Sequence, residues 1–342
     1  MNRSAWITAT QLSTWLQIRP GETRIGQSCQ LLDPAQQDFN AALANARGNG
    51  ARYALVGINE DIGPRANLGR GGADGAWHAA MLQLLNLQSN QYFDASQLLI
   101  TGTIDVTEPS TNDSLESLRQ AVARLDEQVI ETINPIIANG LIPIVIGGGH
   151  NNCYGLLKAA HQVHGQALNC VNFDPHSDFR PLEGRHSGNG FHYAAAQQLL
   201  NRYHIVGLHE LKNSQASLDA LKQHHASWDS YQALYHHRAK TLEQALSQRV
   251  EEYRALTNPL AIEVDLDVIN AMPSSARSIA TLPLNDVLFG IHQFASLQQV
   301  CYLHLAEGAP SCAPEGELAG QRDVGQALAE LIVCFVQSHN MS

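Results

Sequence analysis

The sequence is short of cationic side chains and lacks several kinds of segment. It has 21 Lys and Arg against 32 Asp and Glu, a formal net charge of −11, and no basic run. We therefore expect neither nucleic acid nor an anionic membrane surface as its main partner. No apolar stretch approaches the roughly 20 residues that a membrane span requires. Residues 1–17 lack the long apolar core and the cleavage site of a secretory signal.

Cysteine is scarce and scattered, with six residues and no CxxC pair. Cysteines inside apolar runs, such as Cys170 and Cys334, are typical of buried thiols in a reducing cytosol, so we expect a cytoplasmic protein. The 342 residues, 44% of them apolar, suffice to bury a core without disulfides. Histidine is plentiful by comparison, with 16 residues.

Short apolar runs alternate with longer amphipathic segments. Helical periodicity marks residues 114–140 and 322–338. Most of the predicted strands are nearly continuously apolar, which is typical of parallel strands covered on both faces. The seven predicted strands are residues 52–58, 97–106, 141–149, 167–174, 203–209, 259–269 and 299–306. This alternation predicts one α/β domain over residues 51–342 with a largely parallel sheet. Residues 1–50 are more polar, and we interpret them as an N-terminal extension or cap.

Three of the predicted strands end in residues that can bind metal ions, and sites in such sheets form where the carboxyl ends of the strands meet. The third strand runs into Gly147, Gly148 and Gly149, which let the backbone turn sharply and present His150. On its own, this pattern is more often a plain strand-to-helix connection. A phosphate-binding loop is disfavoured because no GxGxxG or GK[ST] pattern follows.

The fourth and sixth strands end in acidic motifs. Asp174, His176 and Asp178 are spaced so that an extended chain places all three side chains on one face, where uncompensated buried charge is unfavourable. Asp265 and Asp267 also share one face. The alternative for the first motif is a solvated loop with capping aspartates. The alternative for the second is a pair that is protonated or points to water.

Together the three motifs supply two imidazoles and four carboxylates. One divalent ion cannot use so many anionic ligands, whereas two ions about 3.5–4 Å apart with shared carboxylates can. The ligands are rich in oxygen and include no thiolate, which favours Mn²⁺ over zinc or copper. Such a site makes hydroxide from water near neutral pH. The motifs predict a hydrolase with two Mn²⁺ ions bound by His150, Asp174, His176, Asp178, Asp265 and Asp267.

The order GGGH, DPHSD and EVDLD resembles the ureohydrolase family of arginases, agmatinases, guanidinobutyrases and formimidoylglutamases, whose pattern is GGxH, DxHxD and xDxD. Residues 67–73 and 304–310 are similar to two further family segments, so the resemblance covers roughly residues 50 to 340. It implies a three-layer αβα sandwich with a mostly parallel central sheet of about eight strands. Relatives of this fold are usually homo-oligomers, and we expect the same here.

The resemblance also assigns roles to residues. Glu307 matches the carboxylate that binds the amidinium-like group of the substrate, although a solvated strand-end acid is the alternative. The two ions would share Asp174 and Asp265 as bridging ligands. The ligand sets implied are His150, Asp174, Asp178 and Asp265 for one ion, and Asp174, His176, Asp265 and Asp267 for the other.

The segment between residues 178 and 191 indicates the branch of the family. Ser187 stands where arginases and agmatinases place a His, and the SGNGF element resembles the SGTPF-type element of formimidoylglutamases. Arg180 fits that branch because Arg binds carboxylates in bidentate fashion and would repel a guanidinium. The alternative for Arg180 and Arg185 is that both lie on the surface and balance the charge of Glu183.

The resemblance therefore implies hydrolysis of N-formimidoyl-L-glutamate to L-glutamate and formamide. Glu307 would hold the formimino nitrogen, and Asp178 would take a proton from the hydroxide and return it to the departing amine. The substrate carboxylates would be bound by Arg180, Ser187 and Asn189.

His186 is a candidate proton relay, with an exposed loop residue as the alternative. The remaining histidines, including the pairs at 224–225 and 236–237, are predicted to lie on the surface. Two other functions stay open: a ureohydrolase that releases urea from arginine, agmatine or a guanidino acid, and a metal-binding scaffold without turnover. A dinuclear phosphatase is disfavoured because no phosphate loop or Lys cluster accompanies the motifs.

Overall fold

One parallel sheet organises the chain. The computed structural model describes residues 1–342 except 2–4, 37, 105, 107–113 and 342. Its nine strands are β1 (Gln30–Leu31), β2 (Tyr53–Ile58), β3 (Leu98–Ile104), β4 (Ile142–Ile146), β5 (Leu168–Phe173), β6 (Leu200–Leu208), β7 (Ser227–Ser230), β8 (Leu260–Asp265) and β9 (Val300–Ala306). Neighbouring strands are parallel throughout, in the order β1-β3-β2-β4-β9-β8-β5-β6-β7.

The prediction of an αβα sandwich with a mostly parallel central sheet of about eight strands is confirmed, and the described sheet has nine. All seven predicted strands occur, and the structure adds β1 and β7 at the two edges of the sheet. β1 has only two residues and β7 reads Ser-Trp-Asp-Ser, so neither forms an apolar run. The predicted strand over 97–106 includes residue 105, which lies outside the described residues.

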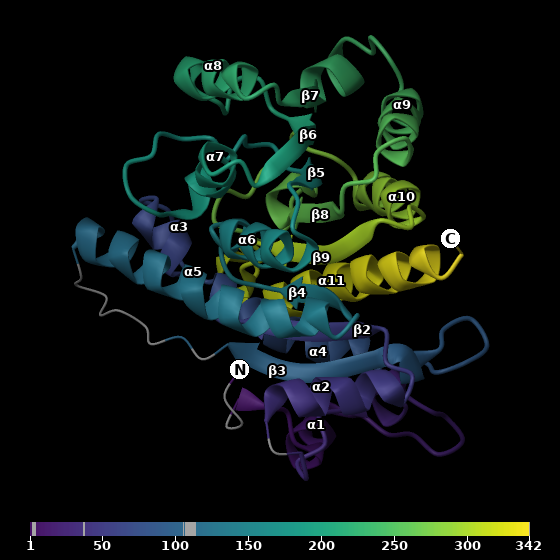
Figure 1. The fold of residues 1–342 in the computed structure, drawn as a ribbon. Coiled ribbons are helices and arrows are strands. Elements are labelled where there is room, and N and C mark those ends of the chain that lie inside the picture. Colours follow the sequence, from purple (N-terminus) through teal and green to yellow (C-terminus); the bar gives the residue numbers. More distant parts are fainter. Residues whose placement is uncertain (2–4, 37, 105, 107–113, 342) are drawn as a thin grey trace.

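Helices cover both faces of this sheet (Figure 1). One layer holds α4 (Ala76–Leu84), α9 (Leu242–Arg254), α10 (Leu284–Ala295) and α11 (Glu317–His339). The other holds α2 (Phe39–Gly48), α5 (Leu115–Ala138), α6 (Asn152–His164), α7 (Gly190–Ala196) and α8 (Gln215–Gln223). Alternate side chains of each strand serve the two layers: Leu55 packs into the first core and Val56 into the second.

Shorter helical elements complete the chain. They are α1 (Ala9–Trp15), α3 (Ile62–Ala66), 3₁₀ turns at Ile25–Gln27, Ala73–Gly75, Ala95–Gln97, Ser187–Asn189, Leu266–Val268 and Pro310–Cys312, and a π turn at Gln232–His236. Within residues 1–50, Ile25 and Leu43 are buried, and Leu31 of β1 pairs with Ile100 of β3. The boundary of the cap at residue 50 stays a prediction.

The two predicted helices are present. The side chain of Ser114 caps α5 by accepting a hydrogen bond from the Ser117 N–H, and Gly140, with φ of +72°, follows its end. Val122 and Val129 of α5 are fully buried, as the apolar periodicity indicates. α11 begins five residues before the predicted segment, at Glu317.

The prediction that the remaining histidines lie on the surface is partly wrong. The pairs at 224–225 and 236–237 are exposed, as predicted. His204 and His304, in β6 and β9, are fully buried. A buried imidazole is tolerated where a polar group satisfies it, and His204 Nε2 lies 3.1 Å from Oδ2 of Asp229.

The chain places its last two strands in the middle of the sheet. β4 and β5 follow each other in sequence, but β9 and β8 lie between them. The loops after these four strands therefore meet at one edge of the sheet, which is where the predicted ligands are. Within the described part of the chain, no helix is both long and apolar enough to cross a membrane.

Candidate metal centre

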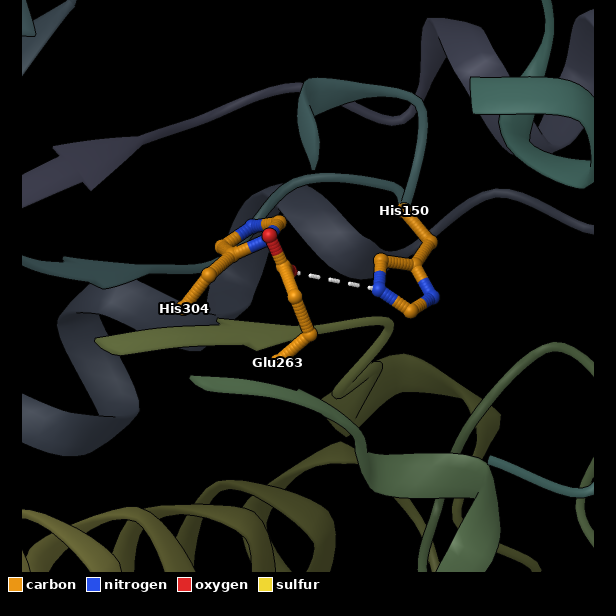
Figure 2. Close-up of side chains that lie close together, drawn as sticks. All are labelled: His150, Glu263 and His304. Carbon is orange, nitrogen blue, oxygen red and sulfur yellow. Dashed lines mark hydrogen bonds and ion pairs between the residues drawn. The ribbon is translucent and has the colours of Figure 1, made fainter. Parts of the chain in front are cut away.

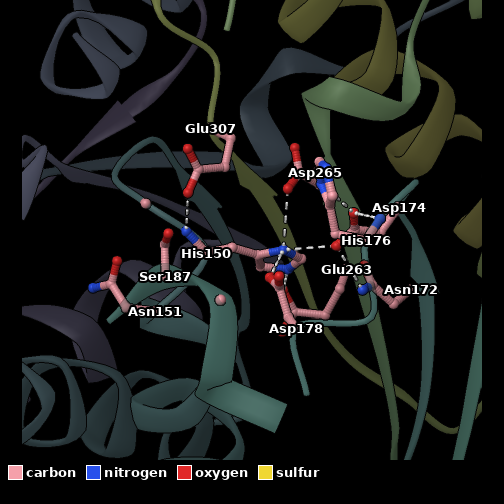
Figure 3. Close-up of polar contacts among 12 residues, drawn as sticks. His150, Asn151, Asn172, Asp174, His176, Asp178, Ser187, Glu263, Asp265 and Glu307 are labelled. Atoms are coloured by element: carbon pink, nitrogen blue, oxygen red, sulfur yellow. Dashed lines mark hydrogen bonds and ion pairs between the residues drawn. The ribbon is translucent and has the colours of Figure 1, made fainter. Parts of the chain in front are cut away.

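The six predicted metal ligands converge at the carboxyl ends of three strands, β4, β5 and β8, and Figure 3 labels all of these ligands except Asp267. His150 follows β4, the DPHSD residues follow β5, and Asp265 ends β8. The ligand atoms form two clusters, each within 4.8 Å, which share Asp265. One cluster contains His150, Asp174, Asp178 and Asp265, and the other contains His176, Asp265 and Asp267.

His150 is fully buried and presents Nδ1 to three carboxylates. Nδ1 lies 3.0 Å from Oδ2 of Asp178, 3.2 Å from Oδ2 of Asp174 and 3.4 Å from Oδ2 of Asp265. Among the described residues neither Nδ1 nor Nε2 has a hydrogen-bond partner, although both are buried. A buried nitrogen of this kind, surrounded by carboxylate oxygens, fits a cation placed between them.

Asp174 connects the two clusters. Its Oδ2 faces His150, whereas its Oδ1 lies 3.5 Å from Nδ1 of His176 and accepts a 2.6 Å hydrogen bond from the His176 N–H. His176 Nδ1 also lies 3.7 Å from Oδ2 of Asp267. Oδ1 of Asp267 is buried and has no hydrogen-bond partner in the part of the chain that the structure describes. The geometry thus fits a bridging role for Asp174.

The electrostatics of the cluster favour a bound cation. Burial, reinforced by neighbouring carboxylates, raises the pKa of Asp178 and Asp265, that of Asp265 well above its usual value. Burial acts on Asp174 in the same direction, but His150 and His176 outweigh it and lower the pKa of Asp174 to about 2. Burial alone would lower the pKa of His176, and Asp174 raises it to about 9. A divalent cation would relieve the repulsion among these acids. The oxygen-rich set with one imidazole per cluster suits Mn²⁺.

The backbone of the site adopts unusual conformations. Gly147 and Gly148 have φ of +86° and +72°, so the sharp turn expected before His150 is present. Asp178 and Glu307 also have positive φ, +48° and +64°, in a region that is strained for residues with a side chain. A backbone contact holds Glu307 there: its N–H donates a 2.9 Å hydrogen bond to the Gly148 carbonyl.

Glu307 lies beside the ligands and is only 4% exposed, so it is not a solvated acid. Its Oε1 accepts a 2.8 Å hydrogen bond from the backbone N–H of His150, as Figure 3 shows. Its Oε2 is buried and has no hydrogen-bond partner within the described residues. Burial, followed by repulsion from Asp265 and Asp267, raises the pKa of Glu307 well above its usual value. An approaching cationic group would find an unpaired carboxylate oxygen here.

Glu60 supports the loop that carries His150, and sequence reasoning missed it. It is fully buried after β2 and accepts hydrogen bonds from the Gly149 N–H at 2.7 Å, the Gly63 N–H at 3.1 Å and the Asn152 amide at 2.7 Å. An acidic residue two positions after the apolar run 52–58 was the available signal, because that strand ends at the same edge of the sheet.

Sequence reasoning also missed a buried group behind His150. Glu263 of β8 and His304 of β9 lie side by side, and Nε2 of His150 is 3.4 Å from Oε2 of Glu263 (Figure 2). Glu263 precedes the Asp265 motif on its strand, so its nearness to the site was visible in the sequence. The pairing with His304 was not, because β9 is distant in sequence.

The segment between Asp178 and Phe191 is held by a buried ion pair. Arg185 is only 6% exposed, and its Nε and Nη2 donate to Asp126 of α5 at 2.8 and 3.1 Å. The alternative of a surface residue answering Glu183 is therefore wrong for Arg185. Oδ1 of Asn189 accepts from Arg185 Nη1 at 2.9 Å and from the His186 N–H at 3.1 Å, and its amide donates to two carbonyls of the same segment. The Asn189 side chain thus makes its hydrogen bonds within this segment.

Arg180 lies at the mouth of the site. It is exposed, donates to Oδ1 of Asn67 at 2.6 Å, and has Nη2 3.4 Å from Oε1 of Glu183. The Asn67 amide in turn donates to Oγ of Ser187 at 3.4 Å. Arg180 lines a cavity of about 400 Å³ together with His176, Asp178 and Lys212. Lys212 also lines a neighbouring cavity that reaches Arg70 and Arg277, and no motif in the sequence singled it out.

His186 is fully buried, so the alternative of an exposed loop residue is wrong. Its Nδ1 accepts a 3.1 Å hydrogen bond from the Gly188 N–H, which leaves the ring proton on Nε2, 3.4 Å from Oε1 of Glu183. Burial, followed by the charges of Arg180 and other nearby arginines, lowers the pKa of His186 to about 3. The relay role stays a prediction.

Comparison with known proteins gives a consistent result. Residues 51–330 match the sequence profile of the arginase family. A formimidoylglutamase of Streptococcus gordonii is 30% identical over 268 residues, which are 72% of this chain and 74% of that protein. A formimidoylglutamase of Chromobacterium violaceum is 32% identical over 202 residues, 57% of this chain and 60% of that protein.

Solved structures share the fold. The formimidoylglutamase of Bacillus subtilis superposes with a TM-score of 0.77 over 98% of this chain and 99% of its own, at 18% identity. The formiminoglutamase of Trypanosoma cruzi with Mn²⁺ superposes with a TM-score of 0.69 over 93% of this chain and 98% of its own, also at 18% identity. At this level of identity the likeness establishes the fold alone.

Proposed function

The chain belongs to the arginase family, and from this premise we propose that it is a metal-dependent hydrolase that cleaves N-formimidoyl-L-glutamate into L-glutamate and formamide. One observation carries the substrate assignment. The unpaired, buried carboxylate oxygen of Glu307 lies inside the site, whereas Arg180 and Lys212 line its mouth. A substrate with a cationic amidine end and two carboxylates matches this order of charges. The formimidoylglutamases among its relatives support the same assignment.

The residues present fit two metal ions. The cluster around His150 would hold one Mn²⁺ and the cluster around His176 the other, with Asp174 and Asp265 between them. The solved formiminoglutamase of Trypanosoma cruzi was described with Mn²⁺. When bound, the pair of ions would supply a hydroxide nucleophile near neutral pH.

Side chains of the protein bind the substrate and transfer the proton. Oε2 of Glu307 accepts a hydrogen bond from the formimino N–H and stabilises its positive charge, which places the trigonal carbon over the clusters. Water adds its oxygen to that carbon, and the bond from the carbon to the glutamate nitrogen breaks. Asp178, which lines the cavity, takes the proton of the attacking water and returns it to the leaving nitrogen. The products are formamide and the free amino group of glutamate.

The substrate carboxylates face the cations at the mouth. Asn67 already orients Arg180, so its guanidinium is prepared for a bidentate contact with one carboxylate. Lys212 lies on the wall of the same cavity and can pair with the second. Ser187 contributes a hydroxyl beside Asn67, and Asn189 acts indirectly by holding the segment together. The cytoplasmic location and the homo-oligomer stay predictions.

A product assay tests the proposal. The chain is stripped with a chelator, reloaded with Mn²⁺ and offered N-formimidoyl-L-glutamate, arginine, agmatine and 4-guanidinobutyrate, with glutamate, formamide and urea measured. We expect glutamate and formamide from the first compound and little urea from the others. Urea from arginine or agmatine without turnover of the first compound would instead assign a ureohydrolase. Absence of any turnover, with metal bound, would assign a scaffold.

A further inference from the structure

Behind the metal clusters lies a polar group that the catalytic scheme does not use. Glu263 of β8 and His304 of β9 are directly paired residues of neighbouring strands, and both are fully buried. Nδ1 of His304 lies 2.6 Å from Oε2 of Glu263, and the hydroxyl of Tyr302 donates to Oε1 of Glu263 at 2.7 Å. Figure 2 shows the Glu263 carboxylate pointing from its strand toward the ring of His150.

Packing alone does not explain this group. Burying a carboxylate and an imidazole is unfavourable compared with apolar side chains of similar size, which often stabilise a protein when they replace a buried ion pair. The neighbouring positions Val264, Leu303 and Leu305 on the same strands are apolar and fully buried. A polar pair in such surroundings therefore points to a task beyond folding.

The geometry gives that task. The two nitrogens of His150 face opposite groups: Nδ1 faces the carboxylates of the first metal cluster, and Nε2 faces Oε2 of Glu263 at 3.4 Å. We propose that Glu263 and His304 form a positioning pair, which keeps the His150 proton on Nε2 and directs the Nδ1 lone pair toward the metal ion. The inference rests on the two-metal centre of the proposed function.

The contacts around Glu263 support this assignment. A carboxylate behind a histidine ligand fixes the tautomer and the ring orientation, and it makes the other nitrogen a stronger donor to the metal. The hydrogen bonds from His304 and Tyr302 hold both oxygens of Glu263 in place, so the carboxylate cannot turn away from His150. Because both oxygens of Glu263 already accept hydrogen bonds, Glu263 is poorly suited to bind a further ion together with His150 and His304.

Metal binding tests the pair without any assay of turnover. Wild type and Glu263→Gln are stripped of metal, and Mn²⁺ is titrated in by calorimetry and followed by electron paramagnetic resonance. We expect two ions with an exchange-coupled spectrum in wild type. In Glu263→Gln, affinity at one of the two sites should fall by about 10- to 100-fold. At one added equivalent the variant should then show the spectrum of an isolated Mn²⁺ ion.

A matched control separates positioning from loss of a buried polar pair. His204→Gln removes a buried histidine of β6 from its carboxylate, Asp229; neither residue belongs to the two metal clusters, and the variant should bind two ions like wild type. His304→Gln should weaken the same single site as Glu263→Gln, and it decides the matter if Glu263→Gln does not fold.

Each outcome has one meaning. If Glu263→Gln, or His304→Gln in its place, binds both ions as tightly as wild type, the inference is overturned. The same holds if His204→Gln loses a site too, because the effect would then not be specific to His150. If wild type itself does not bind two ions, the proposed function fails, and that failure is recognised before any variant is compared.

Discussion

Oε1 of Glu307 accepts a hydrogen bond from the backbone N–H of His150, so the acid after β9 is tied to the loop after β4. This contact fixes the direction of the carboxylate, and in the part of the chain that the structure describes its second oxygen, Oε2, has no hydrogen-bond partner. The same bond links the proposed substrate anchor to a proposed metal ligand, since a shift of either residue moves the other.

Replacing Glu307 by Gln should abolish most turnover without changing the bound metal. Gln keeps the shape and can still accept from the His150 N–H, but it loses the charge that holds the amidine. Loss of one such electrostatic contact lowers kcat by about 100- to 1,000-fold. Steady-state kinetics with metal analysis measures both quantities. A variant with wild-type kcat would remove Glu307 from the site.

Neutral substitutions of Arg180 or Lys212 should raise KM far more than they lower kcat. Each is assigned to a substrate carboxylate, and a hydrogen bond to a charged group contributes about 1.5–3 kcal/mol, or roughly 10- to 100-fold in binding. Arg180→Met and Lys212→Met are compared with the control variant Arg202→Met. Arg202 is exposed near the amino end of β6 and does not line the cavity. If the wild-type protein hydrolyses agmatine, which has no carboxylate, as well as N-formimidoyl-L-glutamate, the assignment is wrong.

Above about pH 6.5, where the histidines with lowered pKa values such as His186 are already neutral, the metal-free protein should become less stable as the pH rises. The pKa of His176 in the folded state is about 9, above its usual value, so its stabilising contribution is complete below about pH 6.5 and is lost as the pH approaches 9. The raised pKa values of Asp178 and Asp265 act in the same direction from a lower pH, because ionisation brings their charges together.

Added Mn²⁺ should reverse this trend. Deprotonated ligands bind the ions better, so the rise in melting temperature caused by Mn²⁺ should grow between pH 6 and pH 9. Thermal unfolding across this range, with a chelator and with Mn²⁺, measures the difference. A metal-free protein whose stability rises over the same interval would contradict the assigned shifts.

The ion pair between Arg185 and Asp126 should matter for folding. Arg185→Met leaves the Asp126 carboxylate buried and unpaired, which costs about 3–5 kcal/mol of unfolding free energy. Asp126→Leu combined with Arg185→Met should recover a large part of that loss, because no buried charge remains. Urea unfolding of the two single variants and the double variant gives the coupling. Strictly additive losses would show that the pair is not coupled.

The residues of the two clusters could be identified from the sequence because each motif is local. Asp174, His176 and Asp178 directly follow β5, a fully buried strand that anchors them at this edge of the sheet. The expectation that they continue the strand with all three side chains on one face is wrong, because β5 ends at Phe173 and Asp178 has a φ of +48°. The glycines before His150 predict a sharp turn, and the structure contains that turn. Each motif lies within a few residues, so no knowledge of the fold was needed to find it.

The remaining parts of the site depend on contacts between distant segments. Glu60 reaches the His150 loop from another strand, and Lys212 enters a cavity wall whose other residues come from several loops. His304 was predicted on the surface because nothing nearby in the sequence shows its partner on β8. The edge strand β7 was not predicted for a different reason: it has only four residues and little apolar character.

The position of β8 and β9 between β4 and β5 has a consequence for synthesis of the chain. β4 and β5 leave the ribosome early, yet their shared edge can be filled only after residues 260–306 have emerged. Until then two apolar strand edges are without their final neighbours, a state that invites mispairing between nascent chains. The candidate metal centre can therefore assemble only when translation is nearly complete.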